Sequence, residues 1–162
     1  MLSTINWVVE TASAVETRAL GMKLAQRLAG DQIVALSGDL GTGKTTFVQG
    51  LAHGLGITAA VTSPSFILIN RYRAPDGRVL HHADCYRLQH AALEMWDAGL
   101  EELLNGDAVV VIEWADRLPG LLPAEHLEIR FEYLDENRRR LAFTAHGHRY
   151  VELLNSIATS PG

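Results

Sequence analysis

The apolar positions of the chain fall into two kinds of pattern. Two short runs, IVALS at 33–37 and VVVIE at 109–113, are apolar at nearly every position. Such runs are typical of central strands that are covered on both faces of a sheet. Other segments carry apolar residues at helical spacing, as Phe47, Leu51 and Leu55 do after the first run. The pattern therefore predicts an α/β sheet, in which buried strands alternate with helices.

A strand and a helix are predicted before the first apolar run. INWVVE at 5–10 is rich in residues that favour strands. Ser13 and Glu16 then have the spacing of a capping box, in which the hydroxyl and the carboxylate each accept a hydrogen bond from a free amide. Apolar residues follow at helical spacing, and Gly30 is placed to end this helix.

Two antiparallel hairpins are predicted in the rest of the chain. FILINRY at 66–72 and VLHHADCY at 79–86 flank Ala-Pro-Asp-Gly at 74–77, which is a good turn sequence. LEIRFEYL at 127–134 and RRRLAFTA at 138–145 alternate in period two around Asp-Glu-Asn. This second pair is expected to form a hairpin at the edge of the sheet.

Two further helices are expected between and after these hairpins. AALEMWDAGLEELL at 91–104 has a helix-like pattern that contains Gly99, and a last helix is expected over 150–157. Trp96 lies in the first of these segments and Trp7 in the predicted N-terminal strand. Both indoles are expected to pack in the core, because large aromatic side chains are buried on average.

Length and composition exclude several classes of protein. The 162 residues fit one domain, 1–162. The net charge is −5, whereas a protein that grips nucleic acid by itself normally has a basic excess. A single cysteine, Cys85, excludes an internal disulfide and favours a reducing, cytoplasmic location. No apolar run reaches membrane-spanning length and the start lacks a signal-peptide pattern, so no membrane attachment is expected.

The stretch GDLGTGKT at 38–45 matches the pattern G-x-x-x-x-G-K-[ST] without a gap. Its glycines let a phosphate chain approach the backbone, and the following helix start adds free amides and a favourable dipole. Lys44 is expected to reach the β- and γ-phosphates, and the Thr45 hydroxyl to bind Mg²⁺. The motif predicts a P-loop NTPase-like, three-layer α/β fold, with a mostly parallel central sheet and antiparallel edge strands.

The expected cofactors are ATP and Mg²⁺. The chain lacks the Asn-Lys-x-Asp signature for guanine, which makes a GTPase the weaker interpretation. The residues expected to contact the nucleotide along the loop are Asp39, Leu40, Gly41, Thr42, Gly43, Lys44, Thr45 and Thr46.

Two acids are candidates for the metal side of this site. Glu113 ends the second apolar run, where P-loop proteins commonly place a metal-side carboxylate. A surface salt bridge is the alternative, which the loop makes the weaker one. Asp84 stands near the end of a predicted strand, and residue types alone leave its role open. His82 and Arg87 beside it are more often packed or solvent-facing residues than catalysts.

A hydroxyl-rich turn, TSPSF at 62–66, follows the helix after the loop. In GTPase-like proteins this position contains a segment that senses the γ-phosphate. From residue types alone, an ordinary Ser-Pro turn is the better interpretation.

Taken in order, GDLGTGKTT, SPSF, HADCYRL and EW resemble one family closely, the bacterial TsaE (YjeE) proteins. The family pattern is roughly G-D-L-G-[AT]-G-K-T-T, [ST]-P-[ST]-[FY], H-x-D-x-Y-R-[LI] and E-W. Members are small P-loop ATPases required for making threonylcarbamoyladenosine in tRNA. The loop alone fits many families, whereas the ordered set is specific and the resemblance covers nearly the whole chain.

The resemblance implies roles for individual residues. It places Lys44 and Thr45 at phosphate and Mg²⁺. It makes Asp84 and Glu113 the acids needed for ATP hydrolysis and metal placement. The implied catalytic set is therefore Lys44, Asp84 and Glu113, and the implied metal set is Thr45, Asp84 and Glu113.

The resemblance also implies two contacts outside the loop, and the chain departs from the family pattern at several positions, Ser65 and Cys85 among them. Trp114 is a neighbouring functional aromatic, and Thr17 a candidate contact near the adenine. Ser65 stands where the family usually has threonine. Cys85 stands where a bulkier apolar residue is common, and is expected to be a small buried group and not a nucleophile, because no activating partner is evident.

For the whole protein, the resemblance implies a weak Mg²⁺-dependent ATPase that is not itself the transferase. TsaD and TsaB would be its partner complex, TsaD performing the transfer and TsaC supplying the threonylcarbamoyl-adenylate. The chain would act as a turnover or reset factor, would meet tRNA only indirectly, and is expected to be a monomer. The alternatives are a small-molecule P-loop kinase, with the arginines at 138–140 as a lid, and a nucleotide-binding adaptor without hydrolysis.

Overall fold

The computed structural model describes residues 4–63, 69–86, 91–118 and 120–159. In chain order the elements are β1 (Thr4–Thr11), α1 (Ala14–Ala25), β2 (Ile33–Ser37), α2 (Lys44–Gly54), β3 (Ile69–Arg73), β4 (Val79–Asp84), α3 (Ala91–Asp97), α4 (Leu100–Leu104), β5 (Val109–Glu113), the 3₁₀ helix η1 (Ala115–Arg117), β6 (His126–Tyr133), β7 (Arg139–His146) and α5 (His148–Ala158).

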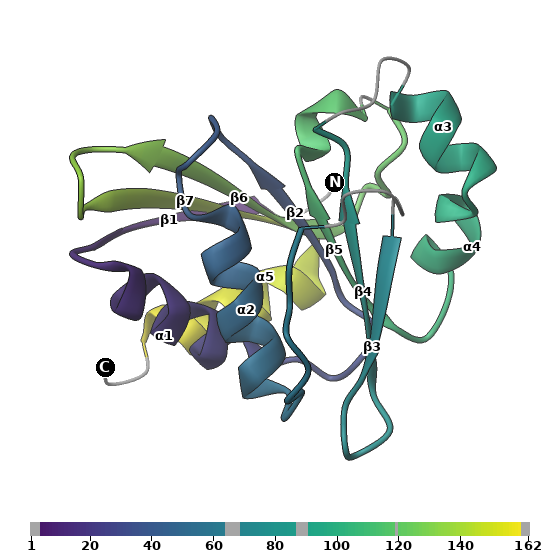
Figure 1. Cartoon of the computed structure of the whole chain (residues 1–162), viewed down its shortest axis with the longest axis horizontal. Coiled ribbons are helices and arrows are strands. Elements are labelled where there is room, and N and C mark those ends of the chain that lie inside the picture. The colour runs from purple at the N-terminus through teal and green to yellow at the C-terminus, as the bar shows by residue number, and fades with distance from the viewer. Residues whose placement is uncertain (1–3, 64–68, 87–90, 119, 160–162) are drawn as a thin grey trace.

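The strands of the described residues form one sheet in the order β1-β7-β6-β2-β5-β4-β3 (Figure 1). The central strands β6, β2, β5 and β4 are parallel to one another. Antiparallel pairs join β3 to β4 at one side, and β7 to β6 and β1 to β7 at the other. The predicted α/β sheet, parallel in the middle with antiparallel edge strands, is confirmed.

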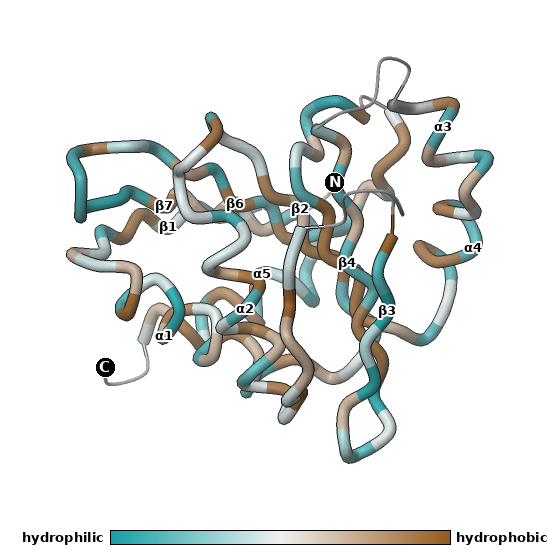
Figure 2. Tube along the Cα trace, in the orientation of Figure 1, coloured by the Kyte–Doolittle hydropathy of each residue, from teal (hydrophilic) through white to brown (hydrophobic). Residues whose placement is uncertain are grey.

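Helices cover both faces of the central strands. Val34 and Leu36 of β2 belong to a large core cluster with residues of α1, α2 and α5. Ala35 points the other way, into a smaller cluster with residues of α3, α4 and η1. The same alternation occurs in β5, which explains why both runs are apolar at successive positions. Figure 2 shows them as hydrophobic segments through the middle of the molecule.

The alternating pattern of β6 and β7 predicted a hairpin at the edge of the sheet. The hairpin forms, but it does not lie at the edge. β6 pairs in parallel with β2, and β7 pairs along its length with β1. The edge strand is therefore β1, whose residues are more than a hundred positions away from β7 in the sequence. No local pattern could indicate this pairing, because it depends on two distant segments meeting.

The helices differ from the predicted ones in their ends. The segment 91–104 is two short helices, because Gly99 adopts a left-handed conformation with φ of 94°. α1 ends at Ala25, before the expected Gly30. At its start the Ser13 hydroxyl accepts from the Glu16 amide, while the Glu16 carboxylate accepts from the amide of Ala12. That arrangement is a capping box shifted by one amide.

The two tryptophans outside the candidate site behave differently. Trp7 is half-buried and packs on Phe143, with ring centroids 5.1 Å apart. Trp96 is 45% exposed, so the expectation that it packs in the core was wrong. It lies on α3, a helix of only two turns, where Met95 takes the buried position. Within the described ranges, no helix is long and apolar enough to cross a membrane.

Candidate functional site

The glycine-rich loop joins β2 to α2 in the conformation that its sequence predicts. The backbone φ angles of Gly38, Gly41 and Gly43 are 133°, 79° and 97°, values that residues with a Cβ rarely adopt. A Cβ at Gly38 would lie 2.4 Å from the backbone oxygen of Phe131. Gly43 precedes α2 without a side-chain cap, so the first amides of the helix face the loop. The loop therefore has the shape of an anion cradle.

Lys44 lies inside this cradle. Its ammonium donates to the backbone oxygens of Gly38 at 2.7 Å and Asp39 at 2.8 Å, and lies 4.1 Å from the ring centroid of Trp114. Burial lowers the pKa of Lys44, and the nearby Glu113 opposes that shift. The carbonyl oxygens of the loop partly balance the positive charge of the ammonium, as the oxygens of a phosphate would.

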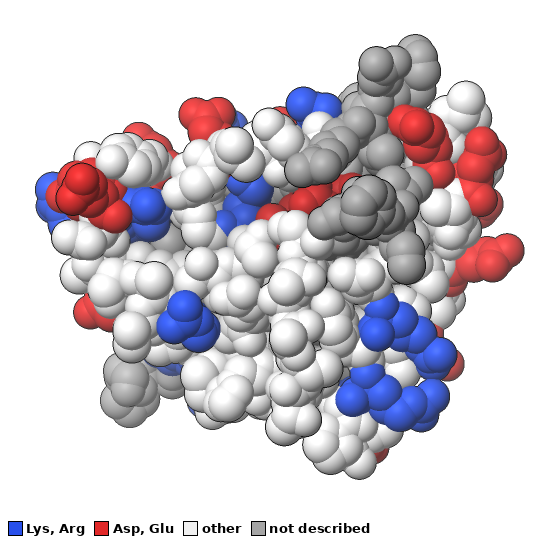
Figure 3. All heavy atoms as spheres, viewed as in Figure 1, with Lys and Arg blue, Asp and Glu red and all other residues white. Residues whose placement is uncertain are grey.

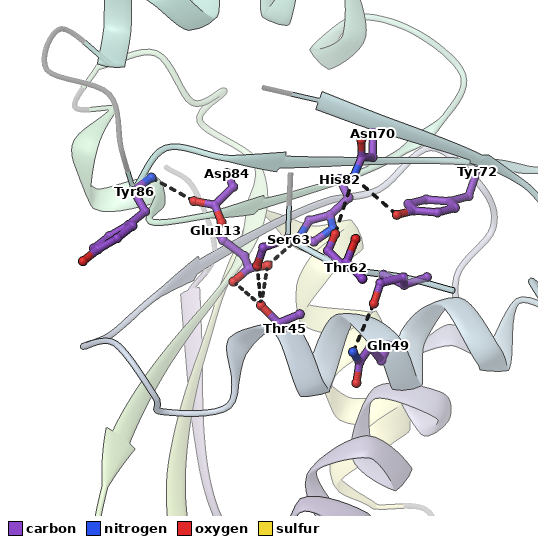
Figure 4. A network of polar contacts seen from close by, with 11 residues as sticks. Thr45, Gln49, Thr62, Ser63, Asn70, Tyr72, His82, Asp84, Tyr86 and Glu113 are labelled. Atoms are coloured by element: carbon purple, nitrogen blue, oxygen red, sulfur yellow. Dashed lines mark hydrogen bonds and ion pairs between the residues drawn. The ribbon is translucent and has the colours of Figure 1, made fainter. Parts of the chain in front are cut away.

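Thr45 and Glu113 are in direct contact (Figure 4). The Thr45 hydroxyl donates to the two carboxylate oxygens of Glu113 at 3.0 and 3.1 Å. Since that hydrogen is directed at Glu113, the Ser63 hydroxyl at 2.9 Å donates to Thr45. A hydroxyl and a carboxylate at the start of a P-loop helix are the oxygen ligands that Mg²⁺ takes beside phosphates.

Glu113 is buried and is held from its other side by His82. The His82 Nε2 lies 2.5 Å from the Glu113 Oε2, and both side chains are almost fully excluded from solvent. The remaining ring nitrogen of His82, Nδ1, is buried and has no hydrogen-bond partner among the described residues. His82 is packed in the interior, as its type had suggested, and it also holds the Glu113 carboxylate in position.

Asp84 lies next to Glu113 in the ladder between β4 and β5. Its carboxylate accepts a hydrogen bond from the Tyr86 amide at 2.8 Å. Burial, together with the charge of Glu113, raises the pKa of Asp84. The pairing of the two strands therefore brings together the two acids that the sequence singled out.

A cavity of about 650 Å³ opens over these groups. Its lining includes the loop, both acids and Ser63, and extends to the start of α1 and to the turn between β6 and β7. Thr17 lines the α1 side, is buried, and hydrogen-bonds the Thr11 hydroxyl at 2.7 Å. The cavity is large enough for a nucleotide, since ligand pockets commonly measure about 300–1,000 Å³.

Trp114 forms one wall of the cavity in a strained conformation. Its φ is 59°, the only positive value outside glycine among the described residues. Such strain is common at functional sites, where the surroundings hold it in place. Here the indole contacts both the ammonium of Lys44 and the ring of Tyr86, whose centroid is 4.9 Å away.

Sequence reasoning missed three residues that line the cavity: Glu136 and Asn137 in the turn between β6 and β7, and Arg139 at the start of β7. Arginines in a charged turn are usually solvated. That holds for Arg138, which pairs with Asp135 on the surface. Arg139 instead donates to the backbone oxygen of Gly41 at 3.2 Å. No local sequence pattern could reveal this contact of Arg139, because the contact depends on β6 of the hairpin pairing with β2 beside the loop.

Three further sequence expectations concern Cys85, the turn at 62–66 and Arg87. Cys85 is fully buried, so the expectation of a small buried group is confirmed, and burial with the neighbouring Asp84 raises the pKa of its thiol to about 12. Thr62 and Ser63 lie within the described residues, but Ser65 and the rest of that turn do not. Arg87 also lies outside them.

The residues present fit a magnesium nucleotide. The left-handed glycines, the cradled Lys44 and the free amides of α2 suit a phosphate chain. Thr45, Glu113 and Asp84 offer the hard oxygen ligands that Mg²⁺ prefers.

Comparison with known proteins identifies the family. The model for "Threonylcarbamoyl adenosine biosynthesis protein TsaE" matches residues 11–141. The chain belongs to the TsaE family. It is 37% identical, over 97% of its length and 96% of the relative, to the "tRNA threonylcarbamoyladenosine biosynthesis protein TsaE" of Bacillus subtilis. The TsaE of a Nostoc species is 40% identical, with 82% of each chain covered.

A solved TsaE-like structure has the same fold. The crystal structure of YdiB from Bacillus subtilis aligns with a TM-score of 0.79 and 35% sequence identity, covering 98% of this chain and 96% of YdiB. The family model spans the glycine-rich loop, both acids and most of the hairpin between β6 and β7. The resemblance stated from four short motifs therefore extends over the whole TsaE fold.

Proposed function

We propose that this chain binds MgATP in the cavity above the loop and hydrolyses it slowly, as an accessory factor for threonylcarbamoyladenosine synthesis in tRNA. The observation that supports ATP binding and hydrolysis is the contact of Thr45 with Glu113 at the end of a P-loop. The family name supports the pathway, since the relatives are tRNA threonylcarbamoyladenosine biosynthesis proteins. TsaB and TsaD are the proposed partners.

The residues of the site have different proposed roles: binding phosphate, binding Mg²⁺ and orienting water. Lys44, which the loop carbonyls hold, would bind phosphate oxygens and neutralise charge that develops there. Thr45 and the acids would hold Mg²⁺, which would supply electrostatic stabilisation of the phosphoryl group. Glu113 would orient water, and His82 keeps its carboxylate in place through the 2.5 Å contact.

The segment 61–63 offers a route from nucleotide to partner. The Gln49 side chain donates to the Val61 backbone oxygen at 3.0 Å, and the Asn70 side chain to that of Thr62 at 3.4 Å (Figure 4). Ser63 is held by Thr45. Mg²⁺ on the Thr45 hydroxyl would compete with the contact from Ser63, so the start of the turn would respond to the nucleotide.

The kinase alternative has weaker support in the arginines of the hairpin. Arg138 pairs with Asp135, and Arg140 with both Glu10 and Glu132. A lid needs cations that reach a bound phosphate; these two are engaged on the surface, and of the three arginines only Arg139 lines the cavity. A non-hydrolysing adaptor is disfavoured because it does not need a buried acid held between a hydroxyl and an imidazole.

The test is ATP hydrolysis by the purified chain, alone and with TsaB and TsaD. We expect slow hydrolysis alone, faster hydrolysis with the partners, and a loss on the order of 100-fold in Glu113→Gln, which removes charge but keeps size. Glu101→Gln, an exposed acid on α4, is the matched control and should behave as wild type. Hydrolysis that ignores the partners and depends on an added hydroxyl compound would support the kinase, and ATP binding without hydrolysis the adaptor.

A further inference from the structure

Two histidines and a glutamate meet on the sheet face that α1, α2 and α5 leave uncovered. His126 begins β6, His146 ends β7, and the two are paired directly in the antiparallel ladder. Their neighbours Leu127 and Ala145 point into the large core cluster. Because successive side chains point to opposite faces, those of His126, Glu128 and His146 lie together on the other face.

The three side chains are close enough to share one ion. Each offers one ligand atom, and these atoms lie within 4.8 Å of one another. The imidazole rings are 4.7 Å apart between centroids. The Nε2 of His146 is buried without a hydrogen-bond partner among the described residues, and the Glu128 carboxylate at 3.7 Å is too distant to be one. A buried nitrogen in this state is costly unless something binds it.

His126 is held in the tautomer that a metal ligand needs. Its Nδ1 lies 2.9 Å from the backbone oxygen of Pro123. A carbonyl oxygen can only accept, so Nδ1 carries the hydrogen and Nε2 keeps its lone pair. Metal-binding histidines commonly donate their other N–H to a backbone carbonyl in this way, which fixes the orientation of the ring.

We propose that His126, Glu128 and His146 form a site for a divalent transition-metal ion, with Zn²⁺ the best chemical match. Two imidazole nitrogens and one carboxylate oxygen are a known ligand set for zinc with a fourth position open to water. Bonds of about 2.0–2.2 Å would place ligand atoms about 3.3 Å apart, so the side chains close in slightly around the ion. The half-exposed Glu128 leaves space for that movement and for water.

This site is separate from the nucleotide site. Along β6, Leu127 pairs with Val34 near the start of β2, whereas Arg130 pairs with Ser37, where the glycine-rich loop begins. At about 3.3 Å per residue, His126 lies roughly 13 Å from the level of the loop. Zinc would clamp the beginning of β6 to the end of β7, and is expected to stabilise the sheet without changing nucleotide binding.

The experiment is a calorimetric titration of the full chain, without a histidine tag, with Zn²⁺ in excess Mg²⁺. The excess Mg²⁺ occupies the carboxylates of the nucleotide site. We expect one Zn²⁺ per chain, a higher melting temperature, and at least a tenfold weaker affinity in His126→Ala and in His146→Ala. His148→Ala is the matched control, since His148 is exposed and pairs with Glu152. It should bind as wild type does.

Two further measurements keep the outcomes distinct. Co²⁺ added to wild type should give the visible absorption of a tetrahedral site, which Zn²⁺ then abolishes. Glu128→Gln keeps the shape of the side chain and should weaken Zn²⁺ binding even if a histidine variant fails to fold. The proposal is overturned if no ion binds, if binding is equal in the His126 and His148 variants, or if Glu113→Gln alone removes it, which would place the ion in the nucleotide site.

Discussion

Asp84 and Glu113 are held side by side on neighbouring strands, partly out of water. Burial and the neighbouring carboxylate raise the pKa of Asp84, which means that its charged form is disfavoured in the folded chain. Proteins retain such arrangements where a cation is to be bound. At the scale of single residues, the candidate site is therefore destabilised locally by the groups that would hold a metal.

This cost predicts how Asp84→Asn changes stability. A carboxyl with a raised pKa holds more protons in the folded state than in the unfolded state, so its contribution to stability falls as the pH rises from about 4 through the raised pKa. Removing the charge should raise the melting temperature at pH 7.5 without Mg²⁺, and the gain should vanish below pH 4. Asp97→Asn, an exposed acid on α3, should show no such gain. An equal loss of stability at both pH values would contradict the interpretation.

Sequence alone could predict the residues whose chemistry is local. Lys44 and Thr45 belong to a continuous motif, and Glu113 ends an apolar strand, so their types and positions point to one site. Ser63 and Arg139 could not be predicted in this way. A serine before a proline and an arginine in a charged turn have common surface roles, and only the folded chain places them against Thr45 and Gly41.

At the scale of elements, α1 and α2 approach each other closely through glycines. A Cβ at Gly50 would lie 1.9 Å from the backbone oxygen of Arg18, and a Cβ at Gly21 would lie 2.3 Å from that of Phe47. No side chain therefore separates the two helix backbones at these points. This packing orients α2, whose first turn carries Lys44 and Thr45, against the sheet.

The close approach predicts that Gly50→Ala destabilises the fold. In an open helix the change would stabilise by about 1 kcal/mol, because alanine is the better helix former. Here overpacking should outweigh that gain, with a net loss of about 1–3 kcal/mol in urea unfolding. His53→Ala, an exposed position on the same helix, reports the propensity effect alone and should be neutral or slightly stabilising. A stabilised Gly50→Ala variant would show that the helices can separate without cost.

The elements themselves were largely predictable, and their partners were less so. The runs at 33–37 and 109–113 form central strands because continuous apolar sequence requires cover on both faces. The division of segment 91–104 at Gly99 depends on one left-handed residue, which a helical pattern does not reveal. The strand β1 was expected, but its pairing with β7 was not, since register between distant strands leaves no local trace.

At the scale of the whole molecule, charge is unevenly distributed. Acidic side chains gather over α3 and α4, and arginines over the hairpin of β3 and β4 (Figure 3). The acids are exposed residues of those short helices, Glu94, Asp97, Glu101 and Glu102. The acids therefore form a negative end to the α3–α4 region, beside the arginines of the β3–β4 hairpin (Figure 3). Such an end favours approach to a partner of complementary charge.

The cavity also predicts a response of the whole molecule to nucleotide. Its lining comes from the start of α1, from the loop, from both acid-bearing strands and from the turn between β6 and β7. MgATP at about 100 times its Kd should stabilise the fold by about 2.7 kcal/mol. Hydrogen exchange should slow at residues 14–17 and 136–139, while the distant turn at 74–77 stays unchanged. Protection confined to the loop would show that the nucleotide does not span the cavity.

The pairing of β1 with β7 bears on how the chain is made. During synthesis, residues 4–11 leave the ribosome long before their strand partner, residues 139–146. Thr11 ends this strand and holds Thr17 at the wall of the cavity. A nascent or truncated chain that stops before residue 139 can display the glycine-rich loop but cannot close the pocket around it. Synthesis through β7 is thus a precondition for an intact ligand site, because β1 has no strand partner before then.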